Sequence, residues 1–193
     1  VPSIIYGLLA IIAIIVVTSY FIFKSAQESK RANQLLALKS LRSQMNPHFI
    51  FNSLNSIQSY ILSNDAEKAV LYLGKFSQLM RLILTNSANK SISLKEELKS
   101  ITYYLELEKL RFENKFDYTI NLDKDMDEEF IEIPPMIIQP YIENAIIHGL
   151  LHKPTKGKIE ITFKQDEEKL ICTVVDDGVG RQRSMEIAKQ SGM

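Results

Sequence analysis

The chain has 193 residues, and its 23 Lys and Arg balance 23 Asp and Glu, so the formal net charge is zero. Hydrophobic residues make up 46% and charged residues 24%, which is typical of a folded chain rather than a disordered one. A zero net charge argues against direct nucleic-acid binding, because proteins with that function usually carry a basic excess. The single cysteine, Cys172, excludes an intrachain disulfide and a cysteine-based metal cluster.

Residues 4–23 form the first predicted element, an uncharged apolar run of twenty residues. A helix of this length spans a hydrocarbon core of roughly 30 Å, and the run shows neither the basic n-region nor the cleavage site of a signal peptide. Lys24, Lys30 and Arg31 follow it, so the positive-inside bias predicts that the later residues are cytoplasmic. We expect one transmembrane helix within residues 1–24.

Residues 25–112 are predicted to be mainly helical. Apolar residues at heptad-like spacing within 25–45 suit a parallel dimer stalk; these are Leu35, Leu38 and Met45. Pro47 interrupts the pattern, because proline removes a backbone donor. The pattern then resumes with an apolar face of Ile50, Leu54, Ile57 and Ile61.

A second amphipathic helix follows a turn at residues 63–65, with Asn64 or Asp65 as its N-cap. Its expected inward face consists of Val70, Leu73, Phe76, Met80 and Ile83. Two helices joined by a short turn form a hairpin, and two hairpins of a dimer would make a four-helix bundle. Ser93 and Glu96 then form an S-x-x-E capping box, which predicts a third helix to about Phe112. Its inward face would be Leu98, Ile101 and Leu105.

The hydrophobic period changes in residues 113–193. Strands are predicted over 116–122, around 159–163 and over 169–175, and the acidic turn 166–168 favours a hairpin between the last two. A helix around 136–150 lies between the strands, with an inward face of Ile138, Ile142, Ala145 and Ile146. The fold class is therefore α+β, with helices packed on strands.

His48 lies beside the proline kink of the second predicted helical segment, and Asn52 lies one turn further along the same face. A kink exposes a side chain that a straight helix would pack, and a neutral imidazole is a competent nucleophile. The Asn52 amide could orient the ring. A lone histidine of this kind is more often explained by helix capping or core packing.

Two further motifs lie near the C-terminal end. Asn144 interrupts an apolar helix face, and it is either a buried amide or a hard neutral ligand for Mg²⁺. His148 and His152 have the spacing of a zinc-binding helix, but Gly149 stands where a zinc hydrolase needs its glutamate. Asp176, Gly178 and Gly180 follow a strand, and they form either an ordinary turn or a nucleotide site with close backbone approach.

Together these stretches resemble the LytS-like sensor histidine kinases. Residues 44–55, Q-M-N-P-H-F-I-F-N-S-L-N, are similar to the atypical phosphoacceptor box of that family. Residues 94–112 contain L-x-x-E-L and Y-L-x-L-E-x-x-R-F, which are similar to its linking helix. Residues 139–149, Q-P-Y-I-E-N-A-I-I-H-G, resemble the N-box of the GHKL ATPase fold, and residues 176–180 resemble the G1 box.

The resemblance implies a division into a transmembrane helix (1–24), signalling and phosphoacceptor helices (25–112), and the first part of a GHKL ATP-binding domain (113–193). It implies that His48 accepts the γ-phosphoryl group of ATP and passes it to an aspartate of a response regulator. Asn144 would hold Mg²⁺ and Asp176 would bind the adenine amine. Gly178 and Gly180 would let the chain pass close to the nucleotide, with His148 facing the phosphates.

The family also implies a homodimer in the bacterial cytoplasmic membrane and a partner that often carries a LytTR-type DNA-binding output. Phe49 replaces the acid that follows the phosphoacceptor in many histidine kinases, so the sequence names no general base. The family's second glycine box would begin near Gly192, so we expect an incomplete ATP site and weak or absent kinase activity from these residues alone. The main alternative is a pseudokinase that dimerises and binds nucleotide without phosphorylating itself, and a third is an ATPase that drives conformational change.

Overall fold

The structure is a computed structural model that describes residues 18–20, 23–24, 27, 47–166 and 169–180. The chain divides into two units, Val1–Gln44 and Met45–Met193. In the first unit, residues 18–20, 23–24 and 27 are helical. Most of the predicted membrane helix, and the heptad-like segment 25–45 apart from residue 27, lie outside the described residues. Among the residues that are described, no helix has both the length and the apolar character needed to cross a membrane.

The second unit begins with a helical hairpin of α2 (Pro47–Leu62) and α3 (Ala66–Asn86). Pro47 is the first residue of α2, where its missing N–H leaves no intrahelical bond unmade. The side chain of Asp65 accepts a hydrogen bond from the Lys68 amide at 3.1 Å, which confirms Asp65 as the predicted N-cap of α3. The predicted hairpin is therefore present.

The buried face of α3 differs from the expected one. Ile83 is buried as predicted, but Val70 and Leu73 are 71% and 49% exposed, while Tyr72 and Leu79 are completely buried. The segment around Val70 is apolar on several sides, so helical periodicity alone permits two inward faces. The contacts of α3 with α2 and α4 select the face that carries Tyr72 and Leu79.

Helix α4 (Leu94–Arg111) begins with the predicted capping box. The Ser93 hydroxyl accepts from the Glu96 amide and the Glu96 carboxylate accepts from the Ser93 amide, each at 3.3 Å. The three residues expected on its inward face are all buried, namely Leu98, Ile101 and Leu105. Short strands β1 (Ile92–Ser93) and β3 (Glu132–Ile133) pair antiparallel beside the start of α4. Sequence patterning gave no signal for this two-residue pairing.

A three-stranded sheet covers the other side of the unit in the order β2–β4–β5. β2 (Phe116–Leu122) runs parallel to β4 (Gly157–Asp166), which pairs antiparallel with β5 (Lys169–Asp176). The alternation expected around residues 159–163 is confirmed, because Ile159, Ile161 and Phe163 are all completely buried. The predicted hairpin is also confirmed, although residues 167–168 of its turn lie outside the described part of the chain.

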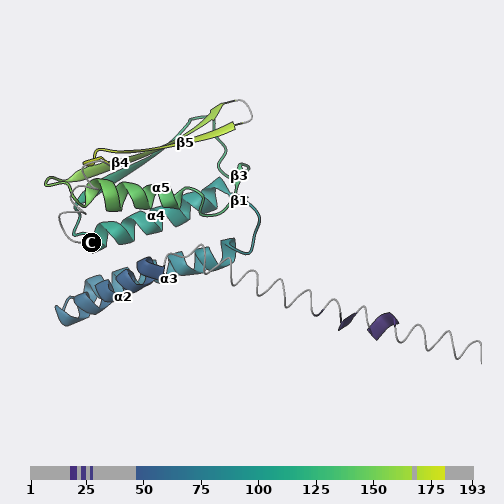
Figure 1. Cartoon of the computed structure of the whole chain (residues 1–193), viewed down its shortest axis with the longest axis horizontal. Coiled ribbons are helices and arrows are strands. Elements are labelled where there is room, and N and C mark those ends of the chain that lie inside the picture. The colour runs from purple at the N-terminus through teal and green to yellow at the C-terminus, as the bar shows by residue number, and fades with distance from the viewer. Residues whose placement is uncertain (1–17, 21–22, 25–26, 28–46, 167–168, 181–193) are drawn as a thin grey trace, which may run out of the picture. The chain divides into compact units, whose positions relative to one another are not determined.

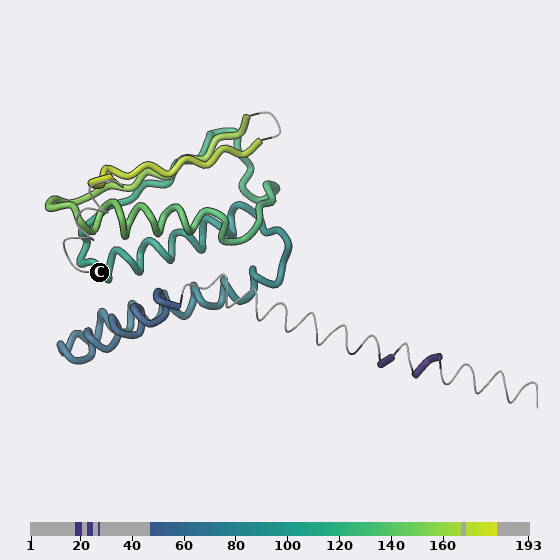
Figure 2. The backbone as a smooth tube through the Cα atoms, in the orientation of Figure 1, coloured from purple at the N-terminus to yellow at the C-terminus, as the bar shows by residue number. Residues whose placement is uncertain are grey.

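The crossover from β2 to β4 contains helix α5 (Gln139–Asn144), which continues into the π-helix η1 (Ala145–Leu150). The expected inward residues Ile138, Ile142, Ala145 and Ile146 are buried. The change to a π-helix at Ala145 was not predicted. Within this unit the sheet forms one layer, α5 and α4 pack beneath it, and the α2–α3 hairpin packs on α4 (Figure 1). The tube in Figure 2 shows α4 between the hairpin and α5, and one core cluster extends from Phe49 of α2 to Phe163 of β4.

Candidate functional site

His48 lies in the first turn of α2 with its side chain exposed, and it contacts Asn52 one turn later. The Asn52 Nδ2 atom lies 3.0 Å from Nδ1 and 3.2 Å from Nε2 of His48. An amide nitrogen only donates, so it can bond only to the ring nitrogen that carries no proton. The predicted pairing of His48 with Asn52 is therefore present in the structure.

Phe49 anchors this turn of α2 to the rest of the unit. Its side chain is 6% exposed, and its ring centroid lies 5.1 Å from that of Tyr104 on α4 and 6.3 Å from that of Phe76 on α3. Aromatic pairs at these separations are stabilising beyond their buried area. Because Phe49 points inward, its neighbour His48 is held on the surface of the hairpin rather than in the core. Core packing of His48, one of the open alternatives, is excluded.

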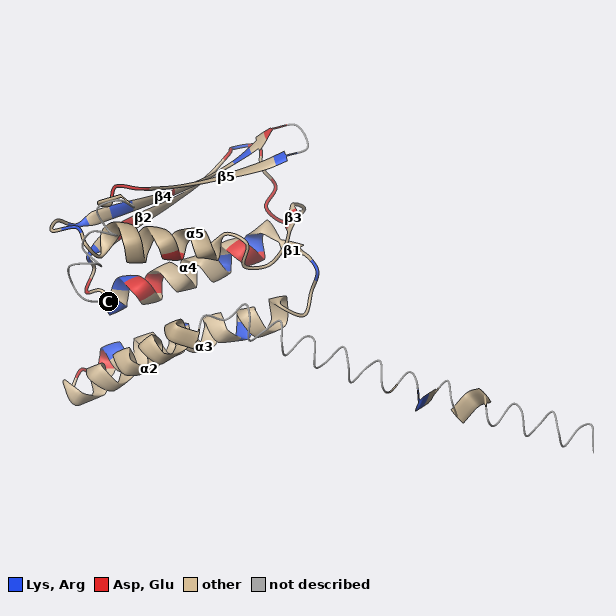
Figure 3. Cartoon of the chain, in the orientation of Figure 1, with Lys and Arg blue, Asp and Glu red and all other residues tan. Residues whose placement is uncertain are grey.

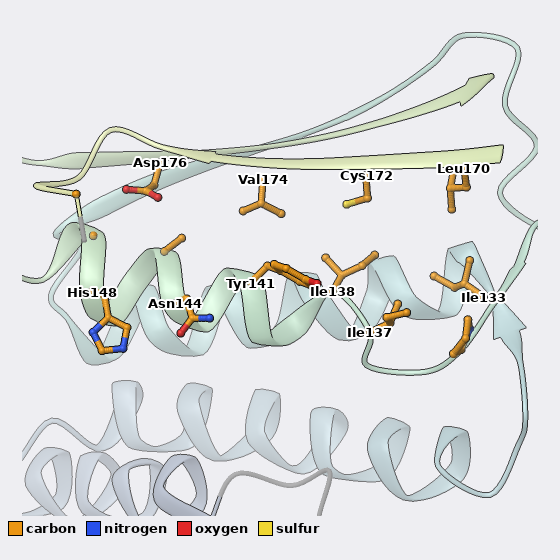
Figure 4. A pocket seen from close by; sticks show the side chains of 14 residues that line it. Ile133, Ile137, Ile138, Tyr141, Asn144, His148, Leu170, Cys172, Val174 and Asp176 are labelled. Carbon is orange, nitrogen blue, oxygen red and sulfur yellow. The ribbon is translucent and has the colours of Figure 1, made fainter. Parts of the chain in front are cut away.

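A cleft of about 840 Å³ lies between β5 and the continuous α5–η1 helix. Figure 4 shows side chains from β5 that point across it toward the helix, including Cys172, Val174 and Asp176. These residues alternate along the strand, so they share one face of the sheet. The full lining is Ile133, Pro134, Ile137, Ile138, Tyr141, Asn144, Ala145, His148, Gly149, Leu170, Cys172, Val174, Asp176 and Gly180.

One end of the cleft is apolar and the other end is polar (Figure 4). Asn144 and His148 contribute to the polar end from successive turns of the helix, and Asp176 contributes from the end of β5. Asn144 is exposed to the cleft, so the alternative of a buried structural amide is wrong. The apolar face of the helix lies on its other side, where Ile142 and Ile146 are buried in the core.

The loop after β5 packs directly against the end of η1. The Asp176 Oδ1 atom accepts a hydrogen bond from the Gly178 amide at 2.9 Å, and the Val179 amide donates to the Gly149 carbonyl at 3.1 Å. A Cβ atom on Gly149 would lie 2.4 Å from Asp176 Oδ1, so a side chain there would displace the Asp176 carboxylate. Gly180 has a φ of +78°, which favours glycine. Gly149 is therefore part of the site, although it was not among the predicted site residues.

Asp177 has a different role from its neighbour Asp176. Its carboxylate pairs with Lys153 Nζ at 2.8 Å and accepts from the Lys158 amide at 2.8 Å. The hydrogen bond from Lys153, followed by that from Lys158, lowers the pKa of Asp177 below its ordinary value. Asp177 thus fastens the loop to the start of β4, which leaves Asp176 as the carboxylate that lines the cleft.

The chemistry of the lining limits what the cleft can do. Burial raises the pKa of the Cys172 thiol to about 11, with a smaller contribution from the charge of Glu97. Cys172 therefore stays protonated at neutral pH and is a poor nucleophile. The described residues contain no group of three or more His, Cys, Asp or Glu side chains arranged to hold a metal ion. The hard neutral oxygen at the cleft is the Asn144 amide, which suits a cation that keeps most of its ligands from water and phosphate.

The structure thus brings together four of the seven residues singled out in the sequence. Asn144, His148, Asp176 and Gly180 line one cleft. Gly178 supports the cleft through its bond to Asp176 but does not line it. His48 and Asn52 lie on α2 and are not among the lining residues.

The chain is similar to known histidine kinases. A family model described as "Histidine kinase" matches residues 36–116, which include α2, α3 and α4. The chain is 41% identical over 143 residues to "Sensor protein LytS" of Staphylococcus haemolyticus, covering 74% of this chain and 24% of that protein. It is 33% identical over 160 residues to the protein of the same name from Oceanobacillus iheyensis, covering 83% of this chain and 27% of that protein.

A third relative has a less specific name. The chain is 37% identical over 153 residues to "Putative uncharacterized protein YwpD" of Bacillus subtilis, covering 77% of this chain and 54% of that protein. The chain spans about a quarter of the length of the LytS proteins that it matches.

Proposed function

The chain belongs to the LytS-like family of sensor histidine kinases, and on that premise we propose that it transfers the γ-phosphoryl group of ATP to His48. His48 would then pass the group to an aspartate of a response regulator. The observation that carries this proposal is the cleft, because it gathers Asn144, His148 and Asp176 from two elements around a space of about 840 Å³. A volume in this range suits a nucleotide-sized ligand.

The donor set at the polar end fits a magnesium nucleotide. The Asn144 amide oxygen would hold Mg²⁺, and the Asp176 carboxylate would accept a hydrogen bond from the exocyclic amine of adenine. Gly178 and Gly180 would let the backbone approach the nucleotide, and His148 would face the phosphates. When bound, Mg²⁺ neutralises phosphate charge and orients the transferred group.

His48 would act as a nucleophile through an unprotonated ring nitrogen. A bond forms from this nitrogen to the γ-phosphorus as the bond from that phosphorus to the bridging oxygen breaks, and ADP leaves. For Nε2 to attack, Nδ1 must carry the proton, so it must donate rather than accept. Rotation of the Asn52 amide would present its oxygen to Nδ1–H and free the lone pair of Nε2. The Asn52 side chain, already 3.0 Å from Nδ1, is placed to do this.

A homodimer follows from the apolar surface of the hairpin. α2 contains no Lys, Arg, Asp or Glu (Figure 3), and α3 carries four such residues, which are Glu67, Lys68, Lys75 and Arg81. Large hydrophobic side chains on these helices are exposed in the single chain; they are Phe51, Leu54, Ile61, Leu62, Val70, Leu71, Leu73 and Leu84. Contiguous exposed apolar surface marks an interaction site. We propose that two hairpins bury this surface in a four-helix bundle.

The remaining assignments follow from the family. We propose that residues 4–23 anchor the protein in the bacterial cytoplasmic membrane and that the part after residue 23 is cytoplasmic. The partner would be a response regulator, of the LytTR type in this proposal, so that contact with DNA is made by the partner and not by this chain.

The test uses the full-length protein and Mg-ATP labelled on the γ-phosphate. We expect acid-labile, base-stable label on the wild type and none on His48→Gln. Asp176→Asn should lose both the label and nucleotide binding, since Asp176 is assigned to the adenine. Absence of label and of nucleotide binding in the wild type would contradict the proposal.

The pseudokinase alternative is separated by the same experiment. It is favoured by one observation, that the position after His48 holds Phe49, which is 6% exposed and packs into the core. A carboxylate that could remove a proton is therefore missing from that position. Nucleotide binding that is lost in Asp176→Asn, together with no label on the wild type, would establish this second function.

A further inference from the structure

Glu97 is a buried carboxylate on α4 that contacts the segment leading into α5. Its side chain is 1% exposed, and its Oε2 atom accepts a hydrogen bond from the Met136 amide at 2.9 Å. Its Oε1 atom is buried without a hydrogen-bond partner. Burial raises the pKa of Glu97, and backbone hydrogen bonds from Met136 and Ile138 oppose that rise. A buried carboxylate is costly, so its contacts need an explanation.

The segment that Glu97 contacts forms one wall of the cleft. Met136 has a φ of 60°, a left-handed conformation that is unfavourable for a non-glycine residue. The next residues, Ile137 and Ile138, line the cleft, and α5 begins at Gln139. Ile138 occupies the N-cap position of α5 and provides no side-chain cap. Glu97 therefore binds the backbone of the segment just before α5 from a neighbouring helix.

The same helix carries the polar end of the cleft. Asn144 is the last residue of α5, and His148 follows in η1 without a break in the helix. The Glu97 charge also contributes to the raised pKa of Cys172, which lies on the opposite wall. Glu97 thus lies near both walls but is not among the residues that line the cleft.

We propose that Glu97 is a positioning residue, which holds the segment leading into α5 and so fixes the depth of Asn144 and His148 in the cleft. This inference rests on the proposed nucleotide function for its effect on ligand binding. The anchoring itself is a property of the chain alone. The two can therefore fail separately.

The test compares two substitutions in the full-length protein. Glu97→Gln keeps a neutral oxygen that can accept from the Met136 amide, whereas Glu97→Met keeps the approximate shape and removes the acceptor. Glu108→Met is the matched control, because Glu108 is also on α4 and 1% exposed but pairs with Arg111. The readouts are amide hydrogen exchange over residues 134–144 and the Kd for Mg-ATP.

We expect Glu97→Met to speed exchange over 134–144 and to weaken Mg-ATP binding by about tenfold or more, as expected when a buried amide loses its hydrogen-bond acceptor. Glu97→Gln should stay within about threefold of wild type in both, because the acceptor remains. Glu108→Met should not speed exchange over 134–144, even if it lowers stability.

Unchanged exchange in Glu97→Met would overturn the anchoring role. Faster exchange with an unchanged Kd would overturn the positioning role, because Mg-ATP binding would then not depend on how firmly the start of α5 is held. Equal losses in Glu97→Gln and Glu97→Met would also overturn it, since charge rather than the hydrogen bond would be responsible. If the wild type binds no nucleotide, the proposed function fails, and the exchange comparison still decides whether Glu97 anchors the helix.

Discussion

Gly178 lies directly against the backbone of Gly149, so the loop after β5 and the end of η1 are in contact without an intervening side chain. A Cβ atom added to Gly178 would lie 2.4 Å from both the Cα atom and the carbonyl carbon of Gly149. The neighbouring Val179 amide donates to the Gly149 carbonyl at 3.1 Å. Two glycines from separate motifs thus close the polar end of the cleft.

Gly178→Ala should therefore separate the loop from η1. Backbone atoms cannot move aside as the end of a flexible side chain can, so we expect the free energy of unfolding to fall by about 1–3 kcal/mol. Nucleotide affinity should fall as well, because Asp176 is hydrogen-bonded to the Gly178 amide. Chemical denaturation and calorimetric titration with Mg-ATP measure the two effects.

Gly74→Ala is the control for this substitution. A Cβ atom at Gly74 would meet nothing within 4 Å, and the residue lies inside α3. We expect stability to rise by up to ~1 kcal/mol, because alanine has the higher helix propensity. A Gly178→Ala variant as stable as this control would contradict the close contact.

The pairing of Gly149 with Gly178 also shows where sequence reasoning reaches its limit. Gly178 was assigned to the site through its own motif, but the need for glycine at 149 depends on a segment that folds against it from elsewhere in the chain. Local sequence patterns predicted the structure correctly where a feature depends only on residues of the same helix or strand. The capping box of Ser93 and Glu96 and the alternation of Ile159 and its neighbours are examples.

The inward face of α3 was mispredicted for a related reason. Val70, Leu71, Tyr72 and Leu73 are consecutive and apolar, so the sequence supports two faces. One face packs within the chain through Tyr72, and the other remains exposed through Val70 and Leu73. A monomeric core needs only one of them. The second face would be buried if the hairpin of a partner chain packed against it, as proposed above.

Val70→Glu should accordingly weaken the proposed dimer. The side chain is 71% exposed in the single chain, so the substitution leaves the core intact. Burial of a valine contributes roughly 1.5 kcal/mol or more, so we expect at least about a tenfold loss of dimer affinity by analytical ultracentrifugation. Phe130→Glu is the control, because Phe130 is 83% exposed but lies outside the hairpin. A dimer that survives Val70→Glu and dissociates with Phe130→Glu would place the interface elsewhere.

Asn52→Ala should slow phosphorylation of His48. The Asn52 amide lies within 3.2 Å of both ring nitrogens, and without it the ring loses its hydrogen-bonded orientation. One hydrogen bond to the reacting group corresponds to roughly a tenfold change in rate. Initial rates of label incorporation measure this effect. Asn55→Ala, at an exposed position of the same helix, should leave the rate unchanged, and an equal loss in both variants would exclude a specific role for Asn52.

The ion pairs of Asp117 should stabilise the fold at neutral pH and lose this effect in acid. Hydrogen bonds from Lys109 and then Lys156, each at 2.6 Å, lower the pKa of Asp117 from its ordinary 3.8 to about 2. Because the folded-state pKa is depressed, its contribution is complete above pH 4 and is lost as the pH falls toward 2. Asp117→Asn should therefore be less stable than wild type at neutral pH and equal to it near pH 2. Denaturant unfolding across this range provides the comparison, and a difference that persists at the lowest pH would contradict the assignment.

The effects of Glu108 and Arg111 on the free energy of unfolding should depend strongly on each other. Glu108 is 1% exposed, and the Arg111 Nη1 atom lies 3.1 and 3.2 Å from its two carboxylate oxygens. Burial raises the pKa of Glu108, and Arg111 opposes that rise. Arg111→Met would leave an unpaired buried carboxylate, so we expect the free energy of unfolding at pH 7 to fall by about 3 kcal/mol.

The loss in Arg111→Met should shrink in mild acid, since a carboxyl whose folded pKa is raised destabilises the fold above that pKa and is relieved by protonation as the pH falls. The double variant Glu108→Gln with Arg111→Met removes the charge along with its partner and should recover most of the stability at pH 7. Unfolding of the wild type, Glu108→Gln, Arg111→Met and the double variant at pH 7 and pH 5 gives the complete cycle. A penalty for Arg111→Met that is the same at both pH values, or that persists in the double variant, would mean that packing of the Arg111 guanidinium on the Phe112 ring, 4.5 Å away, dominates over the buried charge.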